Sequence, residues 1–180
     1  MKNRSDKLLV LAKMGMLTAL SIILVYLVRF PIFPAAPFLQ YDPGAIPMLI
    51  ASFAFGPWAG IAVTLVTATI QTLTVSASGG PYGWLMNVLG TGTFVLTAGL
   101  IYAKSKERTR LRGIIALLCG MLGQTLIMIP ANYIVTPIFT GMPMAAVTGL
   151  MPIIIAFNLI RTGINATITF LLYKRIRRFL

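Results

Sequence analysis

Few side chains in this sequence are able to do chemistry, and the most unusual of them is Arg161. It lies near the middle of a long apolar stretch, with Asn158 three residues before it and Asn165 four residues after it. At that spacing the three side chains share one face of a helix. A guanidinium offers five donors and an amide offers donors and acceptors, which suits the polar edge of a ligand. A structural arginine that binds carbonyls or snorkels is the alternative.

Acidic partners for Arg161 are scarce, since Asp6, Asp42 and Glu107 are the only acidic residues. None of them falls within an apolar stretch, so we expect Asp42 or a bound ligand to pair with Arg161. Histidine is absent, which removes the commonest metal ligand and general base. Carboxylate metal cages and paired-carboxylate catalysis also lack their residues. The sequence therefore predicts no enzyme, no metal site and no cofactor.

Other polar residues interrupt the apolar stretches. Asn87 and Asn132 lie near their ends, while Gln71 and Gln124 lie deeper. An isolated asparagine in a membrane span often forms a hydrogen bond to a neighbouring helix rather than to a ligand. Both roles, helix contact and ligand contact, stay open for Asn87 and Asn132. Nearby aromatic residues are suited either to cover a flat ligand or to anchor the chain at the membrane interface. These aromatic residues are Phe38, Tyr41, Tyr82 and Trp84.

Composition places these residues in a membrane protein. Hydrophobic residues make up 58% of the 180 residues, charged residues only 10%, and mean hydropathy is +0.90, whereas soluble domains carry about 25% charged residues. The run from Gly44 to Val75 has no charge and is too long for one crossing, which needs about 20 residues. Gly56-Pro57 is the expected break. We expect an all-α, polytopic membrane protein with a single domain over residues 1–180.

The charge pattern fixes the expected topology. The net charge of +12 is concentrated at residues 2–13, 104–112 and 174–178, beside the apolar spans, which is the positive-inside pattern and not that of a nucleic-acid-binding protein. If all three clusters are cytoplasmic, the number of crossings between them must be even. This predicts six transmembrane helices with cytoplasmic N- and C-termini. The expected spans are residues 8–28, 45–55, 58–73, 84–102, 113–137 and 150–173.

The same topology leaves residues 29–44, 76–83 and 140–148 outside, where they either cover an outward-facing pocket as a lid or simply connect the helices. On the first span, Ala12, Gly15 and Ala19 form a face of small residues. Small residues let a second helix approach closely. That helix belongs either to a partner protein or to the same bundle.

Several motifs resemble the substrate-binding S components of energy-coupling-factor (ECF) vitamin transporters, most closely the riboflavin-specific branch. The similarity covers nearly the whole chain. Its elements are Pro37-Phe38-Leu39-Gln40-Tyr41-Asp42, Phe55-Gly56-Pro57-Trp58-Ala59-Gly60, Gly80-Pro81-Tyr82-Gly83, Asn132-Tyr133 and Asn158-Leu159-Ile160-Arg161-Thr162-Gly163. The chain departs from flavin-binding members at Thr64 and Thr67-Ala68, and at Arg161, where a lysine is usual.

The resemblance implies high-affinity capture of a vitamin in the cell membrane of a bacterium or archaeon, with riboflavin as the expected transported ligand. It also implies docking on a transmembrane coupling protein that carries two ATPase subunits. Asn132, Asn158 and Arg161 correspond to polar ligand contacts of the riboflavin branch. The full set of expected ligand-binding residues is Phe38, Leu39, Tyr41, Asp42, Tyr82, Asn87, Asn132, Asn158, Arg161 and Asn165. An S component for another small vitamin or precursor, and a stand-alone secondary transporter, remain the alternatives.

Overall fold

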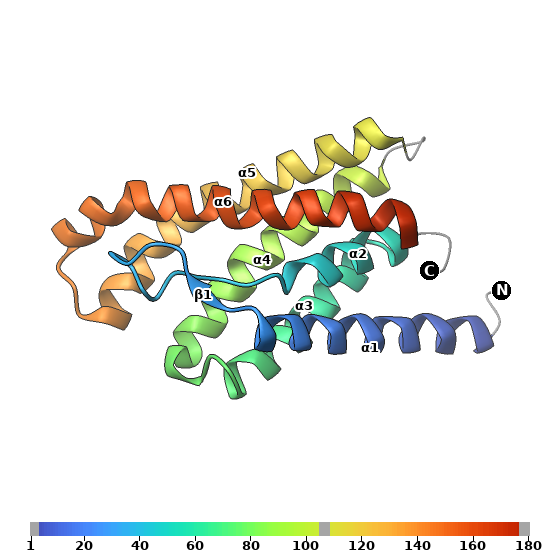
Figure 1. The fold of residues 1–180 in the computed structure, drawn as a ribbon, viewed down its shortest axis with the longest axis horizontal. Coiled ribbons are helices and arrows are strands. Elements are labelled where there is room, and N and C mark those ends of the chain that lie inside the picture. Colours follow the sequence, from blue (N-terminus) through green and yellow to red (C-terminus); the bar gives the residue numbers. More distant parts are fainter. Residues whose placement is uncertain (1–3, 105–108, 177–180) are drawn as a thin grey trace.

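We describe the fold from a computed structural model, which covers residues 4–104 and 109–176. The described part contains six α-helices, which pack together as one bundle (Figure 1). Parts of the basic clusters, at residues 2–3, 105–108 and 177–178, lie outside the described residues. The helices are α1 (Arg4–Leu27), α2 (Ala45–Phe55), α3 (Pro57–Leu73), α4 (Gly80–Ala103), α5 (Arg110–Thr140) and α6 (Met144–Ile176).

The predicted all-α class is confirmed, and each expected span coincides with one helix. Two of the loops that the sequence places outside, residues 76–83 and 140–148, are shorter than predicted. α4 already begins at Gly80, because Pro81 is suited to the first turn of a helix, where its missing N–H is not needed. α6 begins at Met144, so the connection after α5 is short. A short 3₁₀ helix, η1 (Ala77–Gly79), leads into α4.

The helices differ in length and in burial. α1, α4, α5 and α6 are each long and apolar enough to cross a membrane, whereas α2 and α3 are shorter. α2 has only 11 residues, and its residues 45–53 are all buried. At 1.5 Å per residue it is about 16 Å long, so α2 is an interior helix that reaches through only part of the bundle. The beginning of α1 and the end of α6 lie at the same end of the bundle (Figure 1).

Glycines permit the tight turn and the close packing around α2. Gly56 has φ 105°, a conformation that favours glycine, and Pro57 then starts α3 at once. This is the predicted break between the two central helices. A Cβ atom added to Gly99 of α4 would lie 2.0 Å from Ser52 Oγ of α2. α2 and α4 therefore approach as closely as a residue without a side chain allows.

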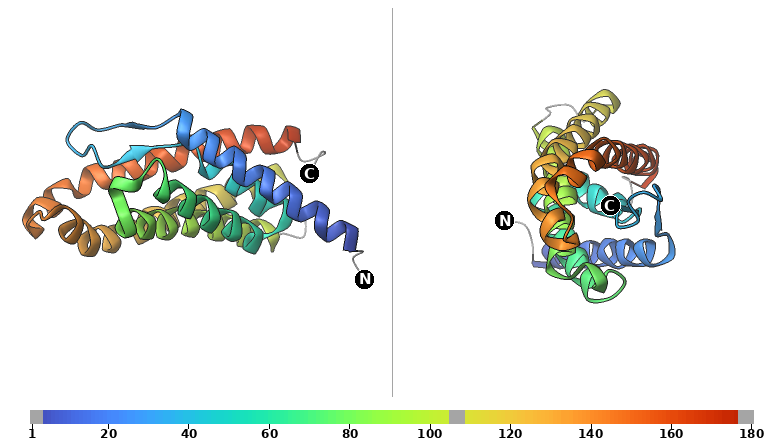
Figure 2. Two further views of the ribbon diagram at one scale, coloured as in Figure 1. Left: turned by 90° about the horizontal axis from the view of Figure 1, so that it is seen from below. Right: turned by 90° about the vertical axis from the view of Figure 1, so that its left-hand side faces the viewer.

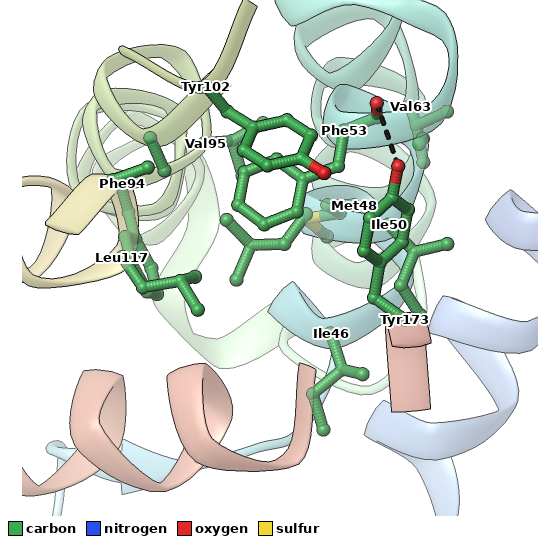
Figure 3. Packing of buried hydrophobic residues seen from close by; sticks show 14 of the residues in the cluster. Ile46, Met48, Ile50, Phe53, Val63, Phe94, Val95, Tyr102, Leu117 and Tyr173 are labelled. Atoms are coloured by element: carbon green, nitrogen blue, oxygen red, sulfur yellow. Dashed lines mark hydrogen bonds between the residues drawn. The ribbon is translucent and has the colours of Figure 1, made fainter. Parts of the chain in front are cut away.

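One end of the bundle contains a close-packed aromatic core (Figure 3). The ring of Phe53 stacks on Tyr102 with centroids 4.4 Å apart, and Tyr173 meets Phe53 edge-on at 5.4 Å. The Tyr173 hydroxyl donates to the Phe53 carbonyl at 3.2 Å. Aromatic pairs in these geometries add about 0.5–1.5 kcal/mol each beyond their burial. This core joins α2, α4 and the end of α6.

The opposite end is covered by the segment between α1 and α2, which lies along α6 (Figure 2). Within it, β1 (Phe30–Pro31) pairs antiparallel with β2 (Gln40–Tyr41). We call residues 28–44 the outer loop. Its Ala36 and Leu39 are buried against Ile154 and Phe157 of α6 in a second apolar cluster. The outer loop is therefore packed onto the bundle rather than extended away from it.

Candidate functional site

A cavity of about 220 Å³ lies beneath the outer loop, somewhat below the roughly 300–1,000 Å³ of typical small-molecule sites. Its walls come from the outer loop, the adjoining ends of α3 and α4, and α5 and α6. The cavity brings together side chains that are more than a hundred residues apart in the sequence. The expected ligand-binding residues that line it are Phe38, Leu39, Asp42, Tyr82, Asn87, Asn132, Asn158 and Arg161.

Arg161 and Asp42 form an ion pair in the wall of this cavity. Arg161 Nη2 donates to Asp42 Oδ2 at 2.9 Å, with only 13% and 7% of the two side chains exposed. The other carboxylate oxygen accepts from the Gly44 backbone N–H at 3.1 Å. The expected pairing of Arg161 with Asp42 is thus present. It ties the outer loop to α6, and breaking a buried pair of this kind typically costs about 3–5 kcal/mol.

Tyr41 and Asn165 lie beside this ion pair but do not line the cavity. The Tyr41 hydroxyl donates to Asn165 Oδ1 at 3.2 Å, and Asn165 Nδ2 donates to the Asp42 carbonyl at 3.1 Å. Burial, followed by the nearby Asp42 charge, raises the pKa of Tyr41, so this phenol remains a neutral donor. Both side chains use their polar atoms to hold the outer loop against α6.

The amides of Asn132 and Asn158 are oriented by their own helices. Asn132 Nδ2 donates to the Met128 carbonyl at 2.7 Å, and Asn158 Nδ2 donates to the Ile154 carbonyl at 2.8 Å. The oxygen of Asn132 accepts from Thr136 at 2.9 Å. The oxygen of Asn158 accepts from Gln124, a buried residue behind the cavity wall, at 3.2 Å. Each amide therefore keeps one N–H and one acceptor position for a ligand.

A second amide group lines the cavity from α3 and α4. Asn87 Nδ2 donates to Gln71 Oε1 at 2.8 Å, and Asn87 Oδ1 accepts from Thr91 at 2.9 Å. Gln71 is 6% exposed and lines the cavity together with Asn87. Sequence reasoning noted Gln71 only as a deep polar residue. Its place in the site depends on how α3 packs against α4, which residue spacing within one helix does not reveal.

Apolar side chains form the rest of the wall. Phe38 and Leu39 contribute from the outer loop, and Phe157 contributes from α6. The ring of Tyr82 packs against Phe139, with centroids 6.2 Å apart. Trp84 lies outside the cavity, where its Nε1–H donates to Thr69. An apolar wall with a few directed amides suits a flat, largely apolar molecule that has a polar edge.

Arg29 is a cavity residue that sequence reasoning did not select. It follows α1, lines the cavity, and its guanidinium donates to the Val75 carbonyl beyond α3. Burial lowers the pKa of Arg29, while the nearby Asp42 carboxylate opposes that shift. Its position as the one basic residue between the first span and the uncharged central run was the available signal. The contact with Val75 joins the outer loop to the α3–α4 side of the cavity.

Comparison with known proteins assigns the family. A family model for the substrate-specific component of ECF transporters matches residues 9–173. This chain belongs to that family. It is therefore a multi-pass membrane protein and the S component of a transporter. A solved structure described as "Structure and mechanism of the S component of a bacterial ECF transporter" superposes with a TM-score of 0.82 at 34% identity, covering 98% of each chain.

Two relatives of known substrate are similar to this chain over most of its length. The S component is 33% identical to the riboflavin transporter RibU of Staphylococcus aureus, over 94% of this chain and 91% of that one. It is 30% identical to the riboflavin transporter FmnP of Bacillus subtilis, over 89% of this chain and 87% of that one. Both alignments extend over nearly the full length of this S component, and the cavity lies within the aligned range of the family model.

The small-residue face of this S component points away from the bundle. Ala12, Gly15 and Ala19 of α1 are all exposed, and a Cβ atom added to Gly15 would meet nothing within 4 Å. Packing inside the same bundle therefore does not explain these small residues.

Within residues 4–104 and 109–176, no three His, Cys, Asp or Glu side chains gather into a metal-binding group.

Proposed function

We propose that this S component binds riboflavin with high affinity and delivers it for uptake by an ECF-type importer. The observation that carries the proposal is the cavity beneath the outer loop. It combines apolar walls with the directed amides of Asn132 and Asn158 and the guanidinium of Arg161. A flavin ring is flat, largely apolar, and carries carbonyl and imide groups along one edge. The riboflavin transporters among its relatives support the same ligand.

In this proposal Asn132, Asn158 and Arg161 contact the polar edge of the ring, while Phe38, Leu39 and Tyr82 cover its faces. Asp42 holds Arg161 in place, and Asn87 contributes from α4. Tyr41 and Asn165 act indirectly, because their hydrogen bonds secure the outer loop that closes the cavity. A ligand of vitamin size requires some widening of the cavity. The outer loop, for which the sequence left open the roles of lid and simple connector, is the part of the wall best suited to move.

The importer itself requires partners. We propose that the exposed face of Ala12, Gly15 and Ala19 docks on a transmembrane coupling protein that carries two ATPase subunits. Small residues permit the close helix contact that such docking needs. ATP would be used by those partners, since the chain has no Gly-x-x-x-x-Gly-Lys-Ser/Thr phosphate-binding loop. The S component would then act as a binding subunit without enzymatic activity.

The membrane topology that we propose has six crossings, with both termini on the cytoplasmic side of the cell membrane. The beginning of α1 and the end of α6 lie at one end of the bundle, beside basic residues, which supports this orientation (Figure 1). Cysteine labelling from outside, in a variant that lacks Cys119, should reach positions 78 and 141 and not position 104. Labelling of position 104 from outside would contradict the orientation.

The ligand is tested most simply by purifying the chain and identifying any retained small molecule by mass spectrometry. Riboflavin should be recovered in an amount close to that of the protein. As a matched control, Arg161→Ala should retain much less when purified in the same way. Recovery of a different vitamin would keep the importer proposal and replace its ligand. Recovery of riboflavin with the control variant at the same level would remove Arg161 from the site.

A further inference from the structure

The cavity contains more polar groups than one edge of a flat ring can use. Asn132, Asn158 and Arg161 come from α5 and α6, whereas Gln71 and Asn87 come from α3 and α4. The second pair is joined by the hydrogen bond between Asn87 Nδ2 and Gln71 Oε1. Two polar groups on different helices suit a ligand that is polar in two places.

The second group retains unused hydrogen-bonding capacity. Gln71 is 6% exposed, yet its Nε2 donates to no residue in the part of the chain that the structure describes. Asn87 uses one N–H on Gln71 and accepts once from Thr91, which leaves one donor and one acceptor position. A ligand that enclosed these groups without pairing with them would lose about 1–3 kcal/mol per group. A ligand that pairs with them avoids that cost.

Hydroxyl groups extend this side of the wall. Ser76 lines the cavity, and its buried Oγ has no hydrogen-bond partner among residues 4–104 and 109–176. Thr72, at the end of α3, and Ser78 of η1 line the cavity on the same side. These amides and hydroxyls are neutral and both donate and accept. Their chemistry matches alcohol groups, which also donate and accept, better than it matches a carboxylate or another purely accepting group.

We propose that Gln71, Asn87 and Ser76 form a subsite for a neutral polyhydroxylated chain. This inference rests on the proposed function, and for riboflavin the chain is the ribityl group attached to the ring. The two polar groups then divide the ligand between them. The α5–α6 group binds the ring edge, and the α3–α4 group binds the chain. Affinity for riboflavin over flavins without the chain arises on α3 and α4.

The test compares two flavins that share a ring: riboflavin, and lumiflavin, which carries a methyl group in place of the chain. Both are titrated by fluorescence quenching into the purified wild type and into Gln71→Met, which keeps the side-chain length and removes the amide. Riboflavin affinity should fall about three- to tenfold in the variant, the range for one net hydrogen bond. Lumiflavin affinity should change less than twofold.

Two further variants serve as controls. Arg161→Ala should weaken both flavins by a similar factor, because it acts on the ring. Thr74 directly follows α3, does not line the cavity, and donates its exposed hydroxyl to the Ile70 carbonyl. Thr74→Val removes that hydroxyl and should weaken neither flavin. Ser76→Ala provides a second test of the subsite that leaves Gln71 in place, should Gln71→Met fail to fold in melting curves. It too should weaken riboflavin selectively.

The outcomes separate the two proposals. If Gln71→Met and Ser76→Ala weaken riboflavin and lumiflavin by the same factor, the riboflavin-binding function stands and the chain subsite is wrong. Unchanged riboflavin affinity in both folded variants would also overturn the subsite. If the wild type quenches neither flavin, riboflavin binding itself is wrong, and the subsite fails with it. Selective loss of riboflavin supports both.

Discussion

The two ends of the bundle bury their polar groups in different ways. At the aromatic end, the Tyr173 hydroxyl is bonded to the Phe53 carbonyl and the rings of Phe53 and Tyr102 stack closely. At the cavity end, Gln71 and Asn87 are largely enclosed but still retain donors and acceptors. The first end is filled by packed aromatic rings and supplies stability. The second end leaves hydrogen-bonding capacity that a ligand completes.

The way in which the outer loop is held makes the same contrast. Its apolar residues pack on α6, but the contacts that position it over the cavity are polar: the ion pair of Asp42 with Arg161 and the bonds around Asn165. Directional contacts can be exchanged for contacts with a ligand, whereas a packed aromatic core cannot open without a large cost. Substitutions at the two ends should therefore separate stability from binding.

The largest effect is expected at the aromatic end. Phe53→Ala removes a buried ring that contacts Tyr102 and Tyr173, so it should lower the free energy of unfolding by about 3–5 kcal/mol. The folded fraction should still bind riboflavin with nearly unchanged affinity. Melting curves and flavin titration of the same sample measure both quantities. Phe53→Leu, which leaves a smaller cavity, should lose less stability.

Arg161→Ala should lower stability as well, because it breaks the buried pair with Asp42, but unlike Phe53→Ala it should also weaken binding. Loss of a hydrogen bond from a charged group costs about 1.5–3 kcal/mol, which corresponds to about one to two decades in riboflavin affinity. The variant also leaves Asp42 without its ionic partner. A double-mutant cycle with Asp42→Asn, followed by flavin titration, measures the coupling of the pair. Equal destabilisation with and without ligand, at unchanged affinity, would make Arg161 purely structural.

Gln124→Leu should have a smaller effect at the same end. Gln124 is 1% exposed, lies behind the cavity wall and donates to Asn158 Oδ1 at 3.2 Å. Removing that donor frees Asn158 from one of its two restraints, so riboflavin affinity should fall by about 0.5–1.5 kcal/mol. The absorption band of bound flavin should shift as well, because its hydrogen bonds change. An unchanged spectrum and affinity would show that the Ile154 carbonyl alone orients Asn158.

Gly15→Leu should have the smallest effect on either stability or binding, since Gly15 is exposed and an added Cβ atom meets nothing within 4 Å. Uptake by the assembled importer should nevertheless be lost, because the bulky residue would block close docking of the partner helix. Transport assays and flavin titration on the same variant measure the two properties. The exposed Leu20→Ala, on the same helix but away from the face of the small residues, serves as a control and should leave uptake unchanged. If Gly15→Leu weakened ligand binding, the docking face would need to be placed elsewhere.

Much of this architecture could be predicted from the sequence, because the bilayer limits the choices. Long uncharged runs favour membrane helices, Gly56-Pro57 favours a break because a glycine precedes the proline, and Arg161 had few possible acidic partners besides Asp42. The starts of α4 and α6 were placed too late, for α4 because Pro81 was taken as part of a turn. Proline is also common just before a helix and in its first turn, where its missing N–H is not needed.

The site was harder to predict, since it depends on contacts between helices. Spacing within α6 placed Asn158 and Arg161 on one face, but it could not reveal that Asn165 would turn its amide to the outer loop. Likewise, nothing in α3 alone shows that Gln71 meets Asn87 of α4 across the packed pair. Periodicity gives the face of a helix, while its neighbours decide what that face contacts.

The most direct test of the contrast between the two ends is a riboflavin titration of the purified protein, followed by fluorescence quenching, for the wild type, Phe53→Leu and Arg161→Ala together. We predict that the wild type and Phe53→Leu quench saturably and with similar affinity. The affinity of Arg161→Ala should be about one to two decades weaker. Failure of the wild type to quench riboflavin fluorescence, or equal affinity in all three proteins, would contradict the assignment of the binding site to the cavity beneath the outer loop.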